Sequence, residues 1–521
     1  MRRALSVGLL SLALTGCSQA PAGRTILLIS LDSVRADTLD FGDAAAFPHL
    51  AELATKGTVF DQAISSSSWT LPAHATMFTG EPAPLHGVEF DDIAIAPGTT
   101  TIPELLHDAG WTTAGWWTGW YTAGEFGFER GFDTYTNGMT GGREIERRYR
   151  DALARGDMDM AKRVLATFDI GGHRDITSPN VLAGLEATVE TVDGDKDLFL
   201  FAHLFDPHYD YIPPAPFDTK FDPDYKGSLD GHDFFENRAI FDSTQSPARR
   251  IGDRDLQHIE ALYKGEIAFT EDYVGRMLAS LEAAGRLEST LVIVTGDHGE
   301  EFFEHGNRGH RTGLYDEVLR VPLMIRDPRS LEARHVAEQV GLVDILPTIA
   351  GFAGLEAPAT STGVDLSAAV AGQPLATRPM ISSLMQHHNE LGYFFVESYR
   401  TEAAKVIRSM TLNEAGELEL VRGEIFDLKL DPGETRSLVT KSTIMDTPRW
   451  AEMEAAFDKL RTKFHTLSPV SRLDRSTTIR EVFASDLGGL GYAGEAGEEP
   501  ELVSPGLSLP WPPGPRPALE K

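Results

Sequence analysis

Short apolar runs alternate with helical stretches along most of this chain, and this alternation is the feature that most constrains its fold. Three runs are apolar enough to be buried strands: Thr25–Leu31, Leu198–Ala202 and Leu291–Thr295. Between residues 259 and 281 the apolar positions recur at steps of three and four, as on one buried face of a helix. Continuous apolar strands separated by helices are typical of a parallel sheet covered on both faces. We therefore expect an α/β fold with a large, mostly parallel sheet sandwiched by helices.

The chain is long enough for a second, smaller unit. It has 521 residues, and single hydrophobic cores stop growing near ~250–300 residues. We expect the large domain to span residues 25–378 and a C-terminal α+β subdomain to span residues 379–465. Residues 466–521 lose all periodicity and include a segment rich in Pro and Gly, so we expect a poorly ordered tail. The charged stretch 141–176 predicts a helical excursion, either a lid or a solvated surface.

The N-terminus has the order of a bacterial targeting segment. Two arginines precede an apolar stretch, which ends in Leu14-Thr15-Gly16-Cys17. This ending resembles a lipobox, so we expect residues 1–17 to be a lipoprotein signal peptide and residues 18–24 to be a tether. Lipidation of Cys17 would anchor the protein to a membrane outside the cytoplasm, in the periplasm or on the cell surface. A plain secretory signal with a chance cysteine is the alternative.

Composition excludes several classes of function. The formal net charge is −31, which makes nucleic acid an unsuitable partner because binding its phosphates needs a basic surface. Cys17 is the only cysteine, so with Cys17 lipidated a disulfide, a cysteine-ligated zinc site and a cysteine nucleophile are all excluded. No run after the N-terminal segment approaches the ~20 apolar residues of a membrane-spanning helix.

Acidic and histidine side chains follow two of the predicted strands. Asp32 comes directly after the first strand, and Asp297 and His298 follow the third. Because the carboxyl ends of parallel strands meet at one edge of a sheet, these side chains are expected to converge. Their mixed oxygen and nitrogen set suits Zn²⁺ or Mn²⁺ better than Ca²⁺. A single Asp at a strand end more often stabilises a turn, so the prediction depends on the convergence.

Thr70 is the candidate nucleophile. Pro72 occupies a position that the first turn of a helix tolerates, so Thr70 is expected just ahead of a helix N-terminus, where free N–H groups attract an anion. A hydroxyl there can attack phosphorus or sulfur if a metal ion lowers its pKa. Without that context Thr70 would simply cap the helix.

Two histidines are candidates for handling the transferred group or the leaving oxygen. His208 follows the middle strand, and His310 follows the third. Either imidazole could stabilise developing charge or protonate the leaving group. A lone histidine is more often structural.

These segments together resemble the sulfatase branch of the alkaline-phosphatase superfamily, over residues from about 25 to about 438. The resemblance rests on the motifs at residues 31–37, 70–74, 79–80, 86–88, 297–299 and 344–348, with a C-terminal signature at residues 426–432. It implies a metal ion held by Asp32, Thr70, Asp297 and His298, with Thr70 as the nucleophile. It also implies that His208 and His310 contact the substrate.

The chain departs from that branch at two points. Sulfatases carry Cys or Ser in a Cys/Ser-x-Pro-x-Arg motif that matures to formylglycine, whereas this chain has Thr70 and His74. The metal-binding positions next to Asp32 and Asp297 are occupied by Ser33 and His298. A Thr nucleophile with an Asp-His pair is typical of the superfamily's phosphodiesterases and phosphoethanolamine or glycerophosphate transferases.

The sequence therefore predicts a metal-dependent hydrolase that cleaves phosphoester or sulfate-ester bonds through a covalent Thr70 intermediate. A small-molecule, lipid or glycan ester is the expected substrate. The alternatives are a sulfatase acting without formylglycine, a transferase, and a catalytically silent surface lipoprotein. A second metal ion is left open, with Asp206, Asp210, His305 and His310 as possible ligands.

Overall fold

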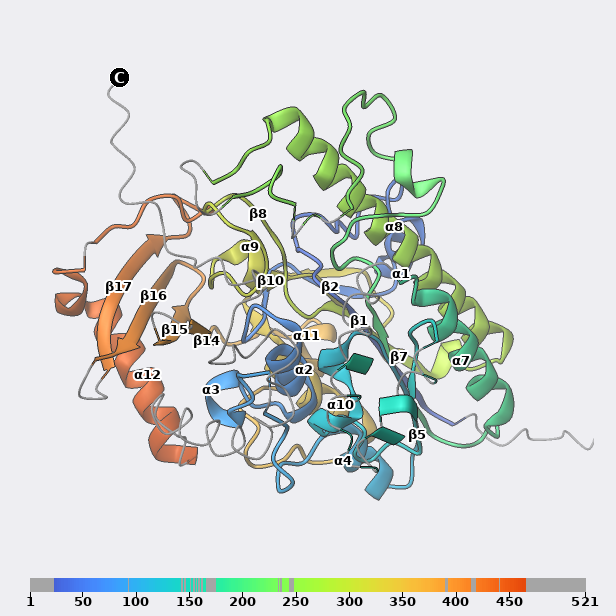
Figure 1. Ribbon diagram of the computed structural model, residues 1–521. Helices are drawn as coiled ribbons and strands as arrows, with labels where there is room; N and C mark the ends of the chain where they lie inside the picture. The colour runs from blue at the N-terminus through green and yellow to red at the C-terminus, as the bar shows by residue number, and fades with distance from the viewer. Residues whose placement is uncertain are drawn as a thin grey trace, which may run out of the picture.

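The computed structural model contains a large central sheet with helices on both faces and a separate smaller sheet near the C-terminus (Figure 1). It describes residues 23–464, apart from residues 92, 142–143, 145–146, 150, 153–154, 156, 158–159, 161–162, 165–174, 233, 235–236, 243–247, 389–391, 414–417 and 440. The predicted signal peptide with Cys17 and the predicted tail lie outside the described residues, as does part of the 141–176 excursion.

The central sheet has eight strands in the order β12-β2-β11-β7-β1-β6-β4-β5. Their bounds are β1 Thr25–Leu31, β2 Thr58–Phe60, β4 Thr112–Trp117, β5 Thr134–Asn137, β6 Leu198–Leu204, β7 Thr290–Gly296, β11 Leu323–Arg326 and β12 Arg334–Val336. Strand β1 pairs in parallel with both β6 and β7 at the centre of the sheet. Only β11 runs against its neighbours β7 and β2 among these described strands, so the mostly parallel sheet is confirmed.

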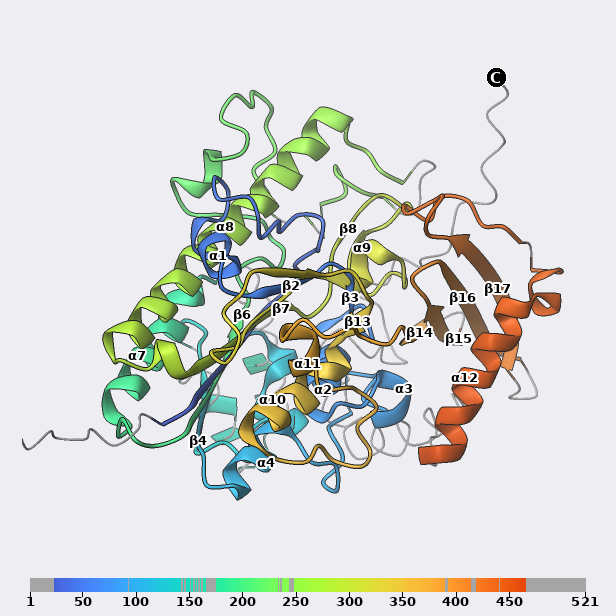
Figure 2. The same cartoon turned by 180° about the vertical axis from the view of Figure 1, so that it is seen from behind.

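Alternating side chains of β1 enter two different cores, which explains why the strand is apolar throughout. Ile26 and Leu28 pack with residues of α2 (Thr70–Thr79), α4 (Ile102–Asp108) and α10 (Ile345–Ala353). Leu27 and Ile29 pack on the other face with α1 (Pro48–Ala54), α7 (Ser178–Thr191) and α8 (Asp253–Ala283). Figure 2 shows α7 and α8 side by side along one face of the sheet. The predicted helix at residues 259–281 is the central part of α8.

The C-terminal sheet is an antiparallel meander in the order β14-β15-β16-β17. Its strands are β14 Met380–His388, β15 Gly392–Arg400, β16 Ala404–Leu412 and β17 Leu418–Asp427, and α12 (Pro448–Phe464) lies beside them in Figure 1. This arrangement agrees with the predicted α+β subdomain.

Buried ion pairs join this sheet to the large domain. Asp316 pairs with Arg400 at 2.7 Å and with Lys405 at 2.9 Å. The amino group of Lys405 also lies 3.0 Å from Glu434. A buried charge is costly unless it is paired, so these contacts fix the sheet against the segment that follows strand β7. Among the helices of the described residues, none combines the length and apolarity needed to cross a bilayer.

Candidate active site

The register of the two central strands brings the predicted carboxylates together. Leu31 of β1 pairs with Gly296 of β7, so Asp32 and Asp297 follow at neighbouring positions on the carboxyl edge of the sheet. Both side chains are fully buried. Ser33 lies between them, with a backbone φ of 58°, and its N–H donates to Asp297 Oδ1 at 3.0 Å. Its hydroxyl donates to Asp32 Oδ1 at 2.7 Å, so Ser33 orients both carboxylates.

Thr70 enters the same site from helix α2. The helix begins at Thr70, one residue earlier than expected, because Trp69 has extended backbone angles and is the N-cap. Pro72 still lies in the first turn, where its missing N–H costs nothing. Thr70 is therefore not the residue that caps the helix, and its hydroxyl lies 3.2 Å from His298 Nε2 and 3.5 Å from Asp32 Oδ2.

The donor set formed by Asp32, Thr70, Asp297 and His298 fits a divalent metal ion. His298 Nδ1 lies 2.9 Å from the Gly299 carbonyl, so it carries the hydrogen and leaves the Nε2 lone pair facing the site. Asp297 Oδ2 is buried and has no hydrogen-bond partner among the described residues. His298 Nε2 lies 3.5 Å from Asp297 Oδ2 and 3.7 Å from Asp32 Oδ1. Ligand atoms ~2.0–2.2 Å from a tetrahedral ion lie about 3.3–3.6 Å apart, so these separations suit one ion.

The two carboxylates are electrostatically unequal. Burial alone would raise the pKa of Asp32, but its contact with His203 and the neighbouring imidazoles of His208 and His298 hold that pKa well below its usual value. Burial and the charge of Asp32 raise the pKa of Asp297 well above its usual value. Asp297 is thus the carboxylate whose negative charge most needs a bound cation.

His310 and His208 lie beside this donor set. The His310 ring centre is 4.5 Å from that of His298, and the His208 ring is 4.9 Å from His310. His310 Nδ1 donates to Glu300 Oε1 at 3.1 Å, and burial raises the pKa of Glu300 to about 8. The structure thus places both histidines near His298, and their role with Thr70 stays a prediction.

The loop that carries His310 is fixed to the segment that carries Thr70. Arg311 N donates to the Ser68 carbonyl at 3.0 Å, and the Arg311 guanidinium stacks 3.9 Å above the Trp69 ring. Arg311 also pairs with Asp91 at 2.9 Å. These contacts hold the imidazole of His310 at a constant position relative to the N-terminus of α2.

The residues suggested as ligands of a second ion do not come together in one metal site. Asp206 accepts bonds from the backbone and side chains of Thr177 and Ser178 at the start of α7, so its role is to cap that helix. Asp210 accepts from Phe234 N at 2.9 Å. His305 pairs with Glu317, away from Asp32 and Thr70. None of these groups with His310 as metal ligands within the described part of the chain.

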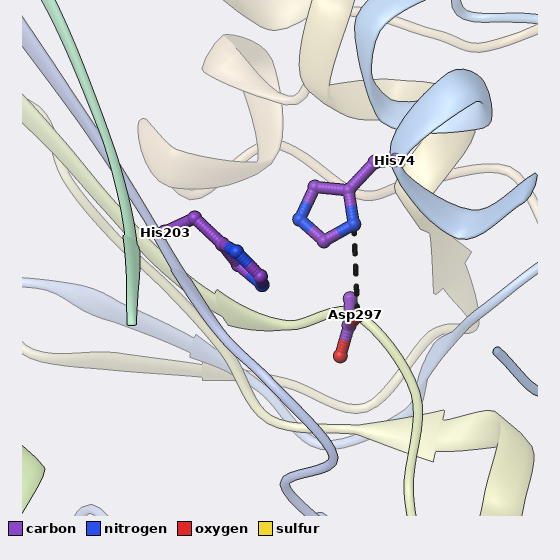
Figure 3. A group of neighbouring side chains, drawn as sticks. All are labelled: His74, His203 and Asp297. Atoms are coloured by element: carbon purple, nitrogen blue, oxygen red, sulfur yellow. Dashed lines mark ion pairs between the residues drawn. The ribbon is translucent and has the colours of Figure 1, made fainter. Parts of the chain in front are cut away.

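Sequence reasoning missed two buried histidines at the site. His203, on β6, lies 3.1 Å from Asp32 Oδ2 through Nε2, and His74, on α2, lies 3.6 Å from Asp297 Oδ2 through Nδ1. Figure 3 shows both rings turned toward Asp297. His203 is the single ionisable residue in a strand that is otherwise apolar, and that signal could have identified it. The sequence distinguishes His74 only as the residue at the arginine position of the sulfatase motif.

Comparison with known proteins agrees with this architecture. The family model described as Sulfatase matches residues 24–355. The uncharacterized sulfatase YidJ of Escherichia coli (strain K12) is 26% identical over 451 residues, which cover 84% of this chain and 83% of that protein.

Two solved structures share the fold. BT4656, in complex with its substrate D-glucosamine-2-N,6-O-disulfate, has a TM-score of 0.65 at 17% identity and covers 86% of this chain and 99% of that one. The phosphonate monoester hydrolase of Agrobacterium radiobacter has a TM-score of 0.62 at 19% identity and covers 85% and 97%. The family match spans most of the large domain, including Asp32, Thr70, Asp297 and His298, and the chain therefore belongs to the sulfatase family of ester hydrolases.

Proposed function

We propose that this sulfatase-like hydrolase cleaves phosphoester bonds, in mono- or diesters, through a covalent intermediate on Thr70. A divalent ion would be held by Asp32, Asp297, His298 and Thr70 itself. The observation that carries the proposal is the position of the Thr70 hydroxyl, 3.2 Å from His298 Nε2 and 3.5 Å from Asp32 Oδ2. His298 Nε2 in turn lies 3.5 Å from the buried Asp297 oxygen, which has no hydrogen-bond partner among the described residues.

The chemistry divides into two displacements at the same centre. When bound, a divalent ion lowers the pKa of a coordinated hydroxyl and offsets charge on the transferred group. Thr70 loses its proton to solvent, and its oxygen forms a bond to phosphorus while the bond to the leaving alcohol breaks. Water then attacks the phosphorus atom of the phosphothreonine, and the bond between phosphorus and the Thr70 oxygen breaks. The transferred group is released as the acid, and the Thr70 hydroxyl is restored. In-line geometry at both steps would require the substrate to lie over the N-terminus of α2.

His208 and His310 are suited to the leaving-group side of the reaction. His310 donates from Nδ1 to Glu300, which fixes the orientation of the ring beside the donor set. An imidazole held in this way can give a proton to the departing oxygen and regain one from the attacking water. Tyr211 donates to the other Glu300 oxygen at 2.8 Å and so supports the same arrangement.

Phosphorus is favoured over sulfur as the reacting centre. Formylglycine-dependent sulfatases have Cys or Ser at the position of Thr70. The formylglycine aldehyde is therefore not expected to form in this chain. The name of the structural neighbour from Agrobacterium radiobacter, a phosphonate monoester hydrolase, is consistent with a phosphorus ester. Sulfate esters are the alternative, supported by the family and by the sulfated substrate of BT4656.

The identity of the ion and the location of the protein are part of the proposal. Carboxylate and imidazole donors favour Zn²⁺ or Mn²⁺ over Ca²⁺, which prefers oxygen ligands alone. The lipobox-like sequence around Cys17 supports lipid anchoring outside the cytoplasm. The substrate would then be a small-molecule, lipid or glycan ester that reaches this compartment.

The test combines a nucleophile variant with a substrate panel. Thr70→Ala is expected to lower turnover of an aryl phosphodiester about 10³-fold or more while metal content falls little, because three ligands remain. Thr70→Ser, which keeps a hydroxyl, is the matched control and should keep measurable turnover. Retained turnover in Thr70→Ala would reject the nucleophile, and faster cleavage of aryl sulfate than of aryl phosphoesters would reject the phosphorus preference.

A further inference from the structure

Asp297 belongs to two groups of potential metal ligands. One group is the set with Asp32 and His298, and the other consists of His74, His203 and Asp297. In the second group one donor atom of each residue lies within 4.8 Å of the others, and all three side chains are fully buried. They come from α2, from β6 and from the turn after β7, and Figure 3 shows them converging.

The hydrogen bonds of His203 leave a lone pair facing a carboxylate. Its Nδ1 lies 2.7 Å from the carbonyl of Thr118, which can only accept, so Nδ1 carries a hydrogen. In the neutral ring Nε2 is then an acceptor, and it lies 3.1 Å from Asp32 Oδ2. Two acceptors at this distance repel each other unless a proton or a metal ion lies between them.

The other two members also present unused electron pairs. His74 Nδ1 lies 2.9 Å from the Thr70 carbonyl, so it too carries a hydrogen, and His74 Nε2 has no partner among the described residues. Asp297 Oδ2 likewise has none. Buried polar atoms are almost always paired, and the ion at Thr70 accounts only for the Asp297 oxygen, so the unpaired His74 Nε2 indicates a further ligand in this buried cluster.

We infer that His74, His203 and Asp297 form a second divalent-cation site, which shares Asp297 with the site at Thr70. Two imidazoles and one carboxylate select an ion such as Zn²⁺, Co²⁺ or Mn²⁺ and disfavour Mg²⁺ and Ca²⁺. The inference rests on the proposed function, because Asp297 serves both ions. It assigns a role to two histidines that neither step of the proposed reaction uses.

A third cluster provides a contrast. Glu301, His305 and Glu317 are also close enough to hold an ion. There, however, His305 Nδ1 bonds to Glu317, His305 Nε2 bonds to the Glu434 carbonyl, and Glu301 accepts from two backbone N–H groups and from Thr312. The atoms that could bind a metal ion are already hydrogen-bonded within the protein, so this cluster is an ion-pair network that does not need a metal.

The experiment counts ions. Metal-free protein is titrated with Co²⁺ and Zn²⁺, and binding is followed by calorimetry and by elemental analysis after gel filtration. The wild type is expected to bind two equivalents, and the double variant His74→Gln/His203→Gln one. His49→Gln/His335→Gln, which alters two more exposed histidines, is the control and should keep two. One equivalent in the wild type, or two in the buried double variant, would overturn the inference.

A measurement on the wild type alone covers the case in which the double variant does not fold. Two Mn²⁺ ions that share a carboxylate lie about 4 Å apart and couple magnetically, whereas one isolated ion gives a six-line spectrum in electron paramagnetic resonance. A coupled spectrum is expected at saturation, and an isolated six-line spectrum would contradict the second site. Failure of the proposed function looks different: the wild type would then bind no ion at all, or lose none of its ions in Asp32→Asn.

Discussion

Thr70 Oγ1 and His298 Nε2 lie 3.2 Å apart, although 228 residues separate them in the sequence. The first residue of a helix on one face of the sheet thus meets the turn at the end of a central strand. Because strand β7 and helix α2 are both anchored in apolar cores, this pair is held rigidly, as the proposed nucleophile and metal ligand must be.

Replacing His310 by alanine should reveal whether it protonates the leaving oxygen. We expect kcat/KM for an aryl phosphodiester to fall about 10²-fold or more, since a positioned acid contributes that much. The loss should grow as the leaving phenol becomes more basic, because a good leaving group needs no proton. A rate measured over a series of substituted phenols checks this, and an equal loss for every phenol would instead assign His310 to charge stabilisation.

His208→Ala provides the comparison for that series. The His208 ring stacks on Phe205 with centres 4.4 Å apart, so its removal also loosens the wall of the site. If His208 contacts the transferred group, its loss should be independent of the leaving phenol. If the rate loss in His208→Ala instead grew with the basicity of the leaving phenol as steeply as in His310→Ala, the two histidines would act as one unit.

Removal of the bound metal should destabilise the fold. Asp32 and Asp297 are buried side by side, and without a cation burial and the charge of Asp32 disfavour the ionised form of Asp297. An ion at 100 times its dissociation constant adds about 2.7 kcal/mol to stability. Thermal unfolding followed by circular dichroism should therefore show a midpoint that falls by several degrees with chelator and recovers with Zn²⁺ or Mn²⁺. In Asp297→Asn the midpoint should no longer respond to chelator.

His305 should make stability depend on pH. Burial alone would lower its pKa, but the hydrogen bond and charge of Glu317 outweigh burial and raise the pKa to about 9. The unfolded value is 6.5, so the stabilisation is complete below pH 6.5 and is lost as pH rises to 9. The full loss for this shift is on the order of 3 kcal/mol. Urea unfolding of the wild type and of His305→Gln should converge across this window, and parallel curves would refute the assignment.

Cys17 should decide where the protein is found. Acylation of this residue would anchor the chain, so Cys17→Ala is expected to move the protein from the membrane fraction to the soluble extracytoplasmic fraction. Cell fractionation and metabolic labelling with a fatty-acid analogue check this. A variant that stays with the membrane, or a wild type without label, would favour a plain secretory signal.

Much of the fold could be predicted from the sequence because its signals are local. The apolar runs at residues 25–31 and 198–202 are strands, and they are apolar throughout because both faces of the sheet are buried. The antiparallel strand β11 could not be predicted in this way, because direction depends on how the chain returns to the sheet rather than on side-chain pattern.

The same distinction between local signals and tertiary arrangement separates the site residues that could be predicted from those that could not. Asp32, Thr70, Asp297 and His298 could be identified because each stands at the boundary of an element and matches a family motif. His203 was not predicted because a histidine within an apolar strand is usually part of the core, and its 3.1 Å contact with Asp32 shows that it belongs to the site. Asp206 shows the opposite error, since its position suggested a ligand while its hydrogen bonds cap α7.

The stereochemical course at phosphorus tests the central claim most directly. A phosphorothioate diester of known configuration would be hydrolysed in ¹⁸O-labelled water, and the configuration of the product determined. Two in-line displacements, first by Thr70 and then by water, predict net retention of configuration. Inversion would mean that water attacks the ester in a single step, and it would contradict the covalent Thr70 intermediate.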